Sequence, residues 1–153
     1  MEVLLTLEKN MVTKEQIRKE LKSERNKLTL SYCKEEEERI FTKLKASKIL
    51  CDHGYIYAYY PLGKELSLLK TLQWALEAGK KVALPKVDGD TMDFYEISSL
   101  DEVEEGCFGV MEPITDKKVN WEEAVCLVPA VGFDKMGNRI GYGAGYYDKY
   151  FEP

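Results

Sequence analysis

The feature that most constrains this sequence is a segment near its C-terminal end, where an apolar run at residues 127–131 leads into three glycines at alternate positions, Gly141, Gly143 and Gly145. A Tyr-Tyr-Asp sequence, residues 146–148, follows directly. Glycine permits positive φ angles and a close approach to a ligand, so consecutive backbone N–H groups can bind anionic oxygens. A helix that begins after the glycines adds the partial positive charge of its N-terminus. The segment is therefore typical of a strand that ends in a phosphate-binding loop.

The residues on either side of the glycines decide between two interpretations, because alternate glycines alone also occur in flexible turns. The segment is not a P-loop, since no Gly-Lys-Ser/Thr follows at the required spacing, and its late position excludes the dinucleotide-binding fingerprint. Arg139 supplies a forked, permanently charged donor for phosphate, and Asp148 supplies a hard oxygen ligand for Mg²⁺. These two residues favour the phosphate site. Asp134, just after the strand, is better explained as a turn residue.

The rest of the chain alternates between helical and strand-like patterns. A capping box at residues 13–16 begins the first helix, on which Lys14 and Arg18 share one face. The predicted elements are helices at 13–30 and 34–50, a strand at 54–60, a helix at 66–78 closed by Gly79, strands at 81–85 and 92–97, a turn or short helix at 98–106, and a strand at 125–131. A strand, a helix and a strand in succession imply parallel pairing. We therefore expect an α/β domain of three layers, with a mostly parallel sheet flanked by helices and ligands bound at the strands' C-terminal ends.

Composition narrows the class of protein. The 153 residues, 44% of them hydrophobic, suit a single domain over residues 1–153. A formal net charge of -5 argues against a general nucleic-acid-binding protein, so any phosphate site must be local. No apolar run approaches the roughly 20 residues that span a bilayer, and the N-terminus lacks the pattern of a secretory signal. The four cysteines form no CxxC pair and the chain has one histidine, which excludes zinc-ligand spacing. We expect a cytoplasmic protein with reduced thiols.

Several ordered motifs together resemble the 5-formyltetrahydrofolate cyclo-ligase family, also called methenyltetrahydrofolate synthetases. They are residues 127–134 and 137–148, Lys14 with Arg18, Tyr60 with Glu65, Val-Ala-Leu-Pro-Lys at 82–86, and Phe-Gly-Val-Met-Glu-Pro at 108–113. The resemblance implies a fold similar to the Rossmann and NagB/RpiA/CoA-transferase folds. It also implies an ATP- and Mg²⁺-dependent ring closure that converts 5-formyltetrahydrofolate to 5,10-methenyltetrahydrofolate and releases ADP and phosphate.

The same resemblance implies roles for individual residues. Arg139 would be catalytic, and Asp148 would bind Mg²⁺. The residues implied in ATP binding are Lys14, Arg18, Arg139, Ile140, Gly141, Tyr142, Gly143, Ala144, Gly145, Tyr146 and Tyr147. The residues implied in folate binding are Tyr60, Glu65, Phe108, Tyr142 and Tyr146. Each also has a plain structural explanation when taken alone: a solvated helix face for the cations, core packing for the aromatic rings, and a helix N-terminal charge for Glu65.

Two departures from the family pattern leave alternatives open. Ala144 occupies a loop position where many relatives carry Lys or Gly, which leaves more of the phosphate charge to Arg139. Relatives also continue past the Tyr-Tyr-Asp sequence with a helix and at least one further strand. We therefore expect either a truncated chain that lacks the last strands or self-association through an uncovered sheet edge, whereas the family is expected to be monomeric. A catalytically impaired folate- or nucleotide-binding module is the alternative function, and a structural protein without a ligand is the third. Residues 1–10 could be an extension upstream of Met11.

Overall fold

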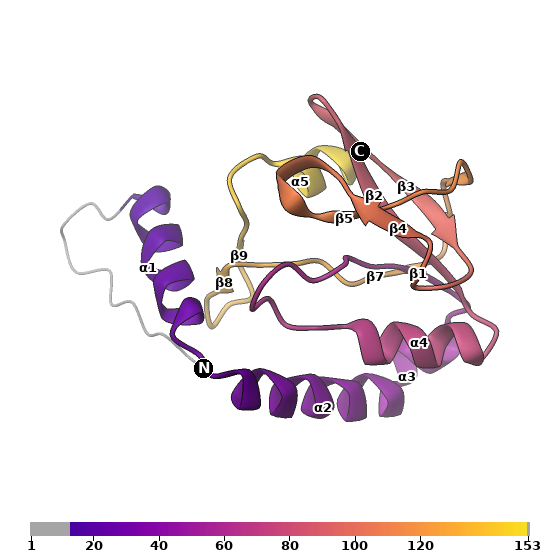
Figure 1. Cartoon of the computed structure of the whole chain (residues 1–153), viewed down its shortest axis with the longest axis horizontal. Helices are drawn as coiled ribbons and strands as arrows, with labels where there is room; N and C mark the ends of the chain where they lie inside the picture. The colour runs from indigo at the N-terminus through magenta and orange to yellow at the C-terminus, as the bar shows by residue number, and fades with distance from the viewer. Residues whose placement is uncertain (1–12, 153) are drawn as a thin grey trace.

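The structure is a computed structural model, and it describes residues 13–152. The possible N-terminal extension, residues 1–10, and the alternative start at Met11 lie outside the described residues. The helices are α1 (Lys14–Asn26), α2 (Leu30–Ala46), α3 (Lys48–Asp52), α4 (Leu69–Glu77), the 3-10 helix η1 (Cys107–Gly109) and α5 (Tyr146–Tyr150) (Figure 1). The strands are β1 (Tyr55–Tyr57), β2 (Lys81–Asp88), β3 (Thr91–Ile97), β4 (Val103–Glu105), β5 (Met111–Pro113), β6 (Lys118–Val119), β7 (Val125–Cys126), β8 (Gly132–Phe133) and β9 (Arg139–Ile140).

The central sheet has the strand order β6-β3-β2-β1-β7. β1 pairs in parallel with β2 and with β7, which confirms the parallel unit predicted from the strand, helix and strand order. β3 pairs antiparallel with β2 and with β6, so the sheet is mixed. The physical reason lies in the connection, because only Gly89 and Asp90 separate β2 from β3 and so short a turn can join only antiparallel strands. β4 with β5 and β8 with β9 form two small antiparallel ribbons outside the main sheet.

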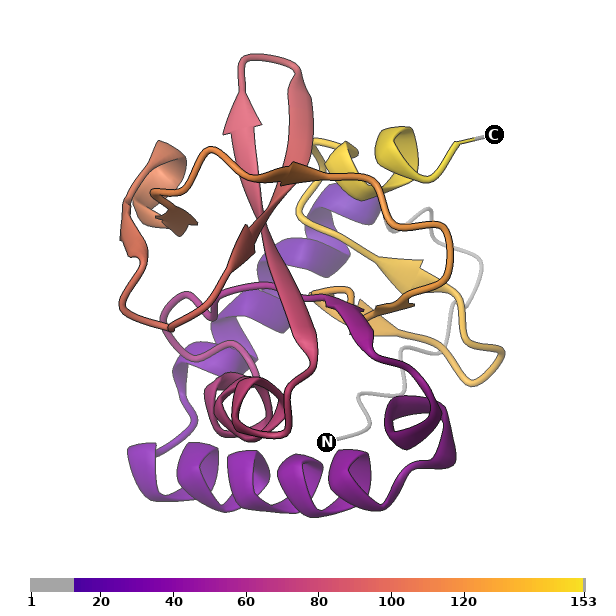
Figure 2. The same ribbon diagram turned by 90° about the vertical axis from the view of Figure 1, so that its right-hand side faces the viewer.

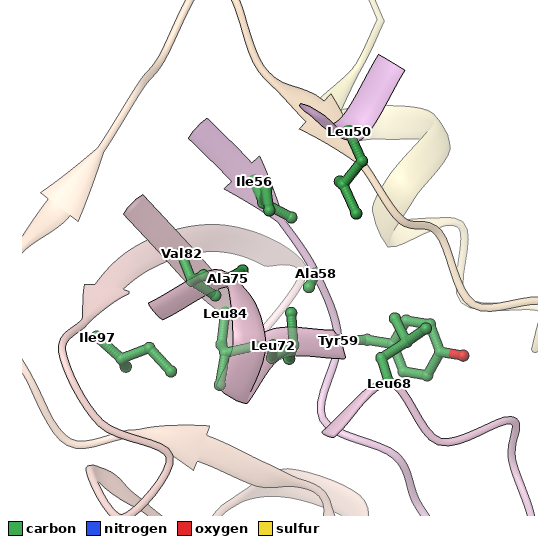
Figure 3. Packing of buried hydrophobic residues seen from close by; sticks show 10 residues of the cluster. All are labelled: Leu50, Ile56, Ala58, Tyr59, Leu68, Leu72, Ala75, Val82, Leu84 and Ile97. Atoms are coloured by element: carbon green, nitrogen blue, oxygen red, sulfur yellow. The ribbon is translucent and has the colours of Figure 1, made fainter. Parts of the chain in front are cut away.

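Successive residues of the central strands point to opposite faces and build two separate cores. On one face Ile56, Val82 and Leu84 pack against α3 and α4 (Figure 3). On the other face Tyr57, Ala83 and Phe94 pack beneath α5. We call these the aliphatic face and the aromatic face. Helices thus cover both sides of the sheet, as Figure 2 shows, and the predicted three-layer α/β class is confirmed.

The helix boundaries near the N-terminus differ from the prediction of one helix at 13–30. α1 ends at Asn26, and α2 begins at Leu30 because Thr29 caps it, its Oγ1 accepting a hydrogen bond from Tyr32 N at 3.1 Å. The predicted helix at 34–50 is likewise two helices, α2 and α3, with a break at Ser47. As a result Ile49 is 64% exposed, and its neighbour Leu50 is buried.

The strand boundaries also differ. β1 and β7 are much shorter than the predicted runs at 54–60 and 125–131. Within the second run, Pro129 carries no N–H to extend a ladder. β2 continues beyond the predicted end at Pro85 because β3 pairs with it as far as Asp88. The segment at 98–106 was expected to be a turn or short helix, and it contains β4.

Between residues 13 and 152, no helix is long and apolar enough to cross a membrane.

Candidate active site

The first helix and the last loop lie against each other, although they are far apart in sequence. Arg18 Nε donates a hydrogen bond to Gly141 O at 2.8 Å, across 123 positions of the chain. The two segments approach closely because Gly132, in β8, has no side chain: a Cβ there would lie 2.6 Å from Leu21 Cδ1. Figure 1 shows α1 beside β8 and β9. The predicted neighbourhood of Arg18 and the glycines is therefore present in the structure.

The glycines at residues 141–145, the glycine loop, leave room for two guanidinium groups. A Cβ at Gly141 would lie 2.8 Å from Arg139 Nη1, and a Cβ at Gly143 would lie 3.5 Å from Arg18 Cζ. Gly143 has φ +103°, a conformation that L side chains rarely adopt. The missing Cβ at Gly141 thus makes room for Arg139, while Arg18 reaches Gly143 at an ordinary contact distance, so one arginine from each end of the chain lies at the same short backbone segment.

Arg139 is held in place from two sides. Its Nη1 donates to Pro129 O at 3.0 Å and its Nη2 donates to Asp148 Oδ1 at 3.3 Å. The β8–β9 ribbon that carries Arg139 is closed by Asp134, whose Oδ1 accepts hydrogen bonds from Met136 N and Asn138 N. Hydrogen bonds from Asn138, first from its side chain and then from its backbone, lower the pKa of Asp134. Asp134 is therefore a turn residue, as the sequence predicted, and its turn fixes the start of β9.

Helix α5 begins at Tyr146, as predicted, after Gly145 in the left-handed conformation at φ 72°. Asp148 lies in its first turn, and its side chain is 82% exposed. In the part of the chain that the structure describes, no three His, Cys, Asp or Glu residues group together as a metal site. Mg²⁺ often takes only one or two protein carboxylates and completes its shell with waters and substrate phosphates. A single exposed carboxylate beside the glycine loop fits that requirement.

Tyr142 connects the glycine loop to the loop between β1 and α4. Its Oη donates to Glu65 Oε2 at 2.6 Å and accepts from Arg25 Nη1 at 2.9 Å. Lys22 Nζ lies 5.0 Å from the centre of the Tyr142 ring, within the range of a cation–π interaction. Burial and then the hydrogen bond to Glu65 raise the pKa of Tyr142 to about 12, so its hydroxyl keeps its proton at neutral pH.

The other predicted site residues differ in their burial and in their distance from the glycine loop along the fold. Tyr60 is half-buried against the aliphatic core, and Tyr146 Oη donates to Gly89 O at 3.0 Å at the tip of the β2–β3 hairpin. Tyr147 packs against the aromatic face, and burial raises its pKa. Lys14 and Ala144 are exposed, and Ile140 lies in β9, half-buried.

Phe108 is the predicted residue that the structure keeps apart. It lies in η1, between β4 and β5, with its side chain 80% exposed and its backbone at φ 59°. Among residues 13–152, no hydrogen bond or aromatic contact joins it to the glycine loop. A non-glycine residue in this conformation is uncommon, and here it directs an aromatic ring away from the protein core.

Three residues of the site were not predicted. Lys22 and Arg25 continue the face of α1 that carries Lys14 and Arg18, and the same helical spacing would have identified them. Lys64 Nζ donates to Asn26 O and to Leu28 O, both at 2.6 Å, and so fastens the β1–α4 loop to the end of α1. No sequence pattern indicates this contact, because its acceptors are backbone carbonyls.

Several known proteins resemble this chain in sequence. The sequence profile of the 5-formyltetrahydrofolate cyclo-ligase family matches residues 10–153. A protein of Caenorhabditis elegans described as a probable 5-formyltetrahydrofolate cyclo-ligase is 27% identical over 150 residues, which are 90% of this chain and 72% of the relative. The 5-formyltetrahydrofolate cyclo-ligase of Mycolicibacterium smegmatis is 32% identical over 102 residues, which are 61% of this chain and 53% of the relative. The matched region therefore spans between about half and three quarters of these longer proteins.

Two solved structures share the fold. The structure of Aquifex aeolicus 5,10-methenyltetrahydrofolate synthetase superposes with a TM-score of 0.79 at 31% identity, covering 90% of this chain and 71% of that protein. The 5,10-methenyltetrahydrofolate synthetase of Mycoplasma pneumoniae gives a TM-score of 0.67 at 22% identity and supports the fold alone. With a profile match over nearly the whole sequence and an α/β fold that brings α1 against the glycine loop, this chain belongs to the 5-formyltetrahydrofolate cyclo-ligase family, a family of ligases.

Proposed function

We propose that the protein catalyses the ATP- and Mg²⁺-dependent cyclisation of 5-formyltetrahydrofolate to 5,10-methenyltetrahydrofolate, with release of ADP and phosphate. The observation that carries the proposal is the glycine loop bracketed by two guanidinium groups, Arg18 from α1 and Arg139 from β9. Phosphoryl transfer depends chiefly on positioning and on neutralising the charge of the phosphates. A glycine loop that two arginines approach suits a nucleoside triphosphate.

In the proposed reaction the γ-phosphoryl group passes from ATP to the formyl oxygen, which makes that oxygen a leaving group. N10 of the folate then attacks the activated carbon, the bond from carbon to the phosphorylated oxygen breaks, and N10 loses its proton as phosphate departs. Arg139 is the proposed catalytic residue, because its contacts with Pro129 O and Asp148 fix a permanent charge beside the loop before substrate arrives. Lys14, Arg18 and the backbone of residues 140–147 would hold the phosphates.

The folate side of the site is proposed to include Glu65, with Tyr60, Tyr142, Tyr146 and Phe108 near the rings. Glu65 suits the N–H donors of the pteridine because its carboxylate is half-buried and accepts hydrogen bonds at both oxygens. Phe108 is exposed on η1, apart from the glycine loop, so it would contact a face of the folate ring from a different segment of the chain. Asp148 would hold Mg²⁺, which when bound neutralises phosphate charge and orients the transferred group.

The main alternative is a catalytically impaired module of the same fold that binds folate or nucleotide. It is favoured by one observation, that the Asp148 carboxylate is already paired with Arg139 Nη2 at 3.3 Å. The two functions differ in ATP consumption. The module would bind ligand without forming ADP, whereas the enzyme would form both ADP and methenyltetrahydrofolate. The absorbance of methenyltetrahydrofolate measures its formation.

The assignment of Arg139 is tested by Arg139→Ala, with Arg39→Ala as the matched control. Arg39 lies on α2 with its side chain 67% exposed and paired with Glu36. Hydrogen bonds to charged groups contribute roughly 1.5–3 kcal/mol, so Arg139→Ala should weaken MgATP binding by about 10- to 100-fold and leave 5-formyltetrahydrofolate binding nearly unchanged. Calorimetric titration measures both affinities. Equal losses for the two ligands would contradict the role of Arg139, and absence of turnover by the folded wild-type protein would overturn the proposed enzyme.

A further inference from the structure

Both oxygens of the Glu65 carboxylate accept hydrogen bonds from the protein itself. Its Oε1 accepts from Leu62 N at 2.7 Å, and its Oε2 accepts from Tyr142 Oη at 2.6 Å. The first partner is a backbone group of the same loop, three residues away. The second is a side chain 77 positions away, carried by the glycine loop and 40% exposed. The two hydrogen bonds therefore differ in how easily they break. The bond from Leu62 N is fixed by the local backbone, whereas the Tyr142 side chain can rotate into solvent.

Tyr142 is also held on the side opposite Glu65. Arg25 Nη1 donates to its Oη at 2.9 Å, and this charged donor strengthens the hydrogen bond that the hydroxyl makes to Glu65. Arg25 in turn belongs to α1, which Lys64 fastens to the β1–α4 loop. The set of Tyr142, Glu65 and Arg25, here called the tyrosine latch, thus joins the three segments that surround the site.

The pteridine ring of a folate presents two parallel N–H donors, one on the ring and one on the amino group. A carboxylate that binds this pair uses both of its oxygens, as it does with the fork of an arginine. In the protein alone, Oε2 of Glu65 already accepts one hydrogen bond, from Tyr142 Oη. A folate that binds Glu65 in this way shares that oxygen with the tyrosine hydroxyl or displaces it, and in either case the hydrogen bond from Tyr142 is weakened.

We propose that the tyrosine latch competes with the folate substrate for Glu65 and couples the folate pocket to the glycine loop. The inference rests on the proposed function, since it assigns the pteridine to Glu65. Folate binding weakens the latch, and because Tyr142 lies between Gly141 and Gly143, weakening it loosens the proposed phosphate-binding loop. By thermodynamic linkage, an ATP analogue must then change folate affinity by the same factor as folate changes that of the analogue. Arg25 and Tyr142 are positioning residues in this scheme.

The test is calorimetric titration of 5-formyltetrahydrofolate, without ATP, into the wild-type protein and Tyr142→Phe. The variant keeps the ring and removes the hydroxyl. Because one competing hydrogen bond disappears, folate should bind about 2- to 10-fold tighter to Tyr142→Phe. Arg25→Gln weakens the latch without touching Glu65 and should shift the affinity in the same direction by a smaller factor. Tyr55→Phe is the matched control, because Tyr55 is 43% exposed and lies at the start of β1, away from the loop that carries Glu65.

The second measurement repeats the titrations with a non-hydrolysable ATP analogue bound. In the wild-type protein the analogue should change folate affinity, and in Tyr142→Phe that factor should fall towards one. Unchanged or weaker folate binding by Tyr142→Phe, or an equal coupling factor in both proteins, overturns the latch. Failure of the wild-type protein to bind 5-formyltetrahydrofolate at all overturns instead the proposed function on which the latch rests. Unfolding curves of each variant exclude misfolding as the cause.

Discussion

The two faces of the central sheet are built from the same strands but differ in how they are closed. The aliphatic face is sealed by α3 and α4, and Ile56, Leu72 and Val82 are fully buried there. The aromatic face is covered by α5, a helix of only five residues, and a cavity of about 760 Å³ opens beside it. Tyr57, Trp121 and Tyr150 are among the residues that line this cavity.

This difference in closure distinguishes the part of the core that supports the fold from the part that lies next to the proposed site. The helix that covers the aromatic face also carries Asp148 and follows directly on the glycine loop, so the least enclosed part of the core lies next to the proposed chemistry. The aliphatic face reaches the site at its edge, through Tyr60 and through Tyr59, whose Oη donates to Leu66 O at 2.6 Å in the β1–α4 loop. We therefore expect stability to depend mainly on the aliphatic face and ligand binding mainly on the aromatic one.

The largest expected effect is on the aliphatic face. Leu72→Ala leaves a cavity where α4 packs on the sheet and should lower the free energy of unfolding by about 3 kcal/mol. Tyr150→Ala on the aromatic face should cost about half as much despite the larger side chain, because its ring borders an existing cavity that water can fill. Guanidinium unfolding measures both. Equal losses would show that the aromatic face is closed as tightly as the aliphatic one.

A smaller effect, of opposite sign, is expected within the aliphatic face. Thr71 Oγ1 in α4 is the buried side-chain polar atom that lacks a hydrogen-bond partner between residues 13 and 152. Thr71→Val keeps the shape, removes the unsatisfied hydroxyl and should stabilise the protein by about 1 kcal/mol. Thr115→Val is the matched control, since Thr115 Oγ1 donates to Glu96 O at 2.6 Å and its loss should destabilise. If Thr71→Val destabilises the protein, the Thr71 hydroxyl has a hydrogen-bond partner, and water reaches the aliphatic face more than its packing indicates.

The sequence predicted the fold where local patterns decide it. The capping box at Thr13 and Gln16 is formed in the structure, and Gly79 ends α4 with φ +81°. What could not be predicted depends on pairing between distant segments. Nothing in residues 103–105 indicates a strand, because β4 exists only through its pairing with β5. Pro129, which cannot extend the ladder of β7, lies inside the apolar run that was assigned to a strand.

For the site, the sequence predicted one long-range contact and missed another. Arg18 was expected near the glycines, and it lies there because α1 packs on β8. The contact between Tyr142 and Glu65 could not be predicted, since each was assigned to the substrate and neither to the other. The roles of these residues, self-association through the edge strand β7 and the single domain stay predictions.

The smallest expected effect concerns pH and separates the buried tyrosines of the two faces. Burial raises the pKa of Tyr147 on the aromatic face and of Tyr59 on the aliphatic face above the ordinary value of 10.0. The folded state then holds these protons more tightly than the unfolded state, so the associated stability is complete below about pH 10 and is lost as pH rises further.

Tyr147→Phe should change stability little at pH 7, because the ring and its packing remain. At about pH 11 it should retain up to about 1 kcal/mol that the wild-type protein loses, since one proton contributes at most about 1.4 kcal/mol per pH unit. Tyr59→Phe should show the same alkaline gain but also a loss at pH 7, because it forfeits the hydrogen bond to Leu66 O. Urea unfolding at pH 7 and pH 11 measures both variants. If Tyr147→Phe were as costly at pH 7 as Tyr59→Phe, the hydroxyl on the aromatic face would have a structural partner, and that face would be as fully organised as the aliphatic one.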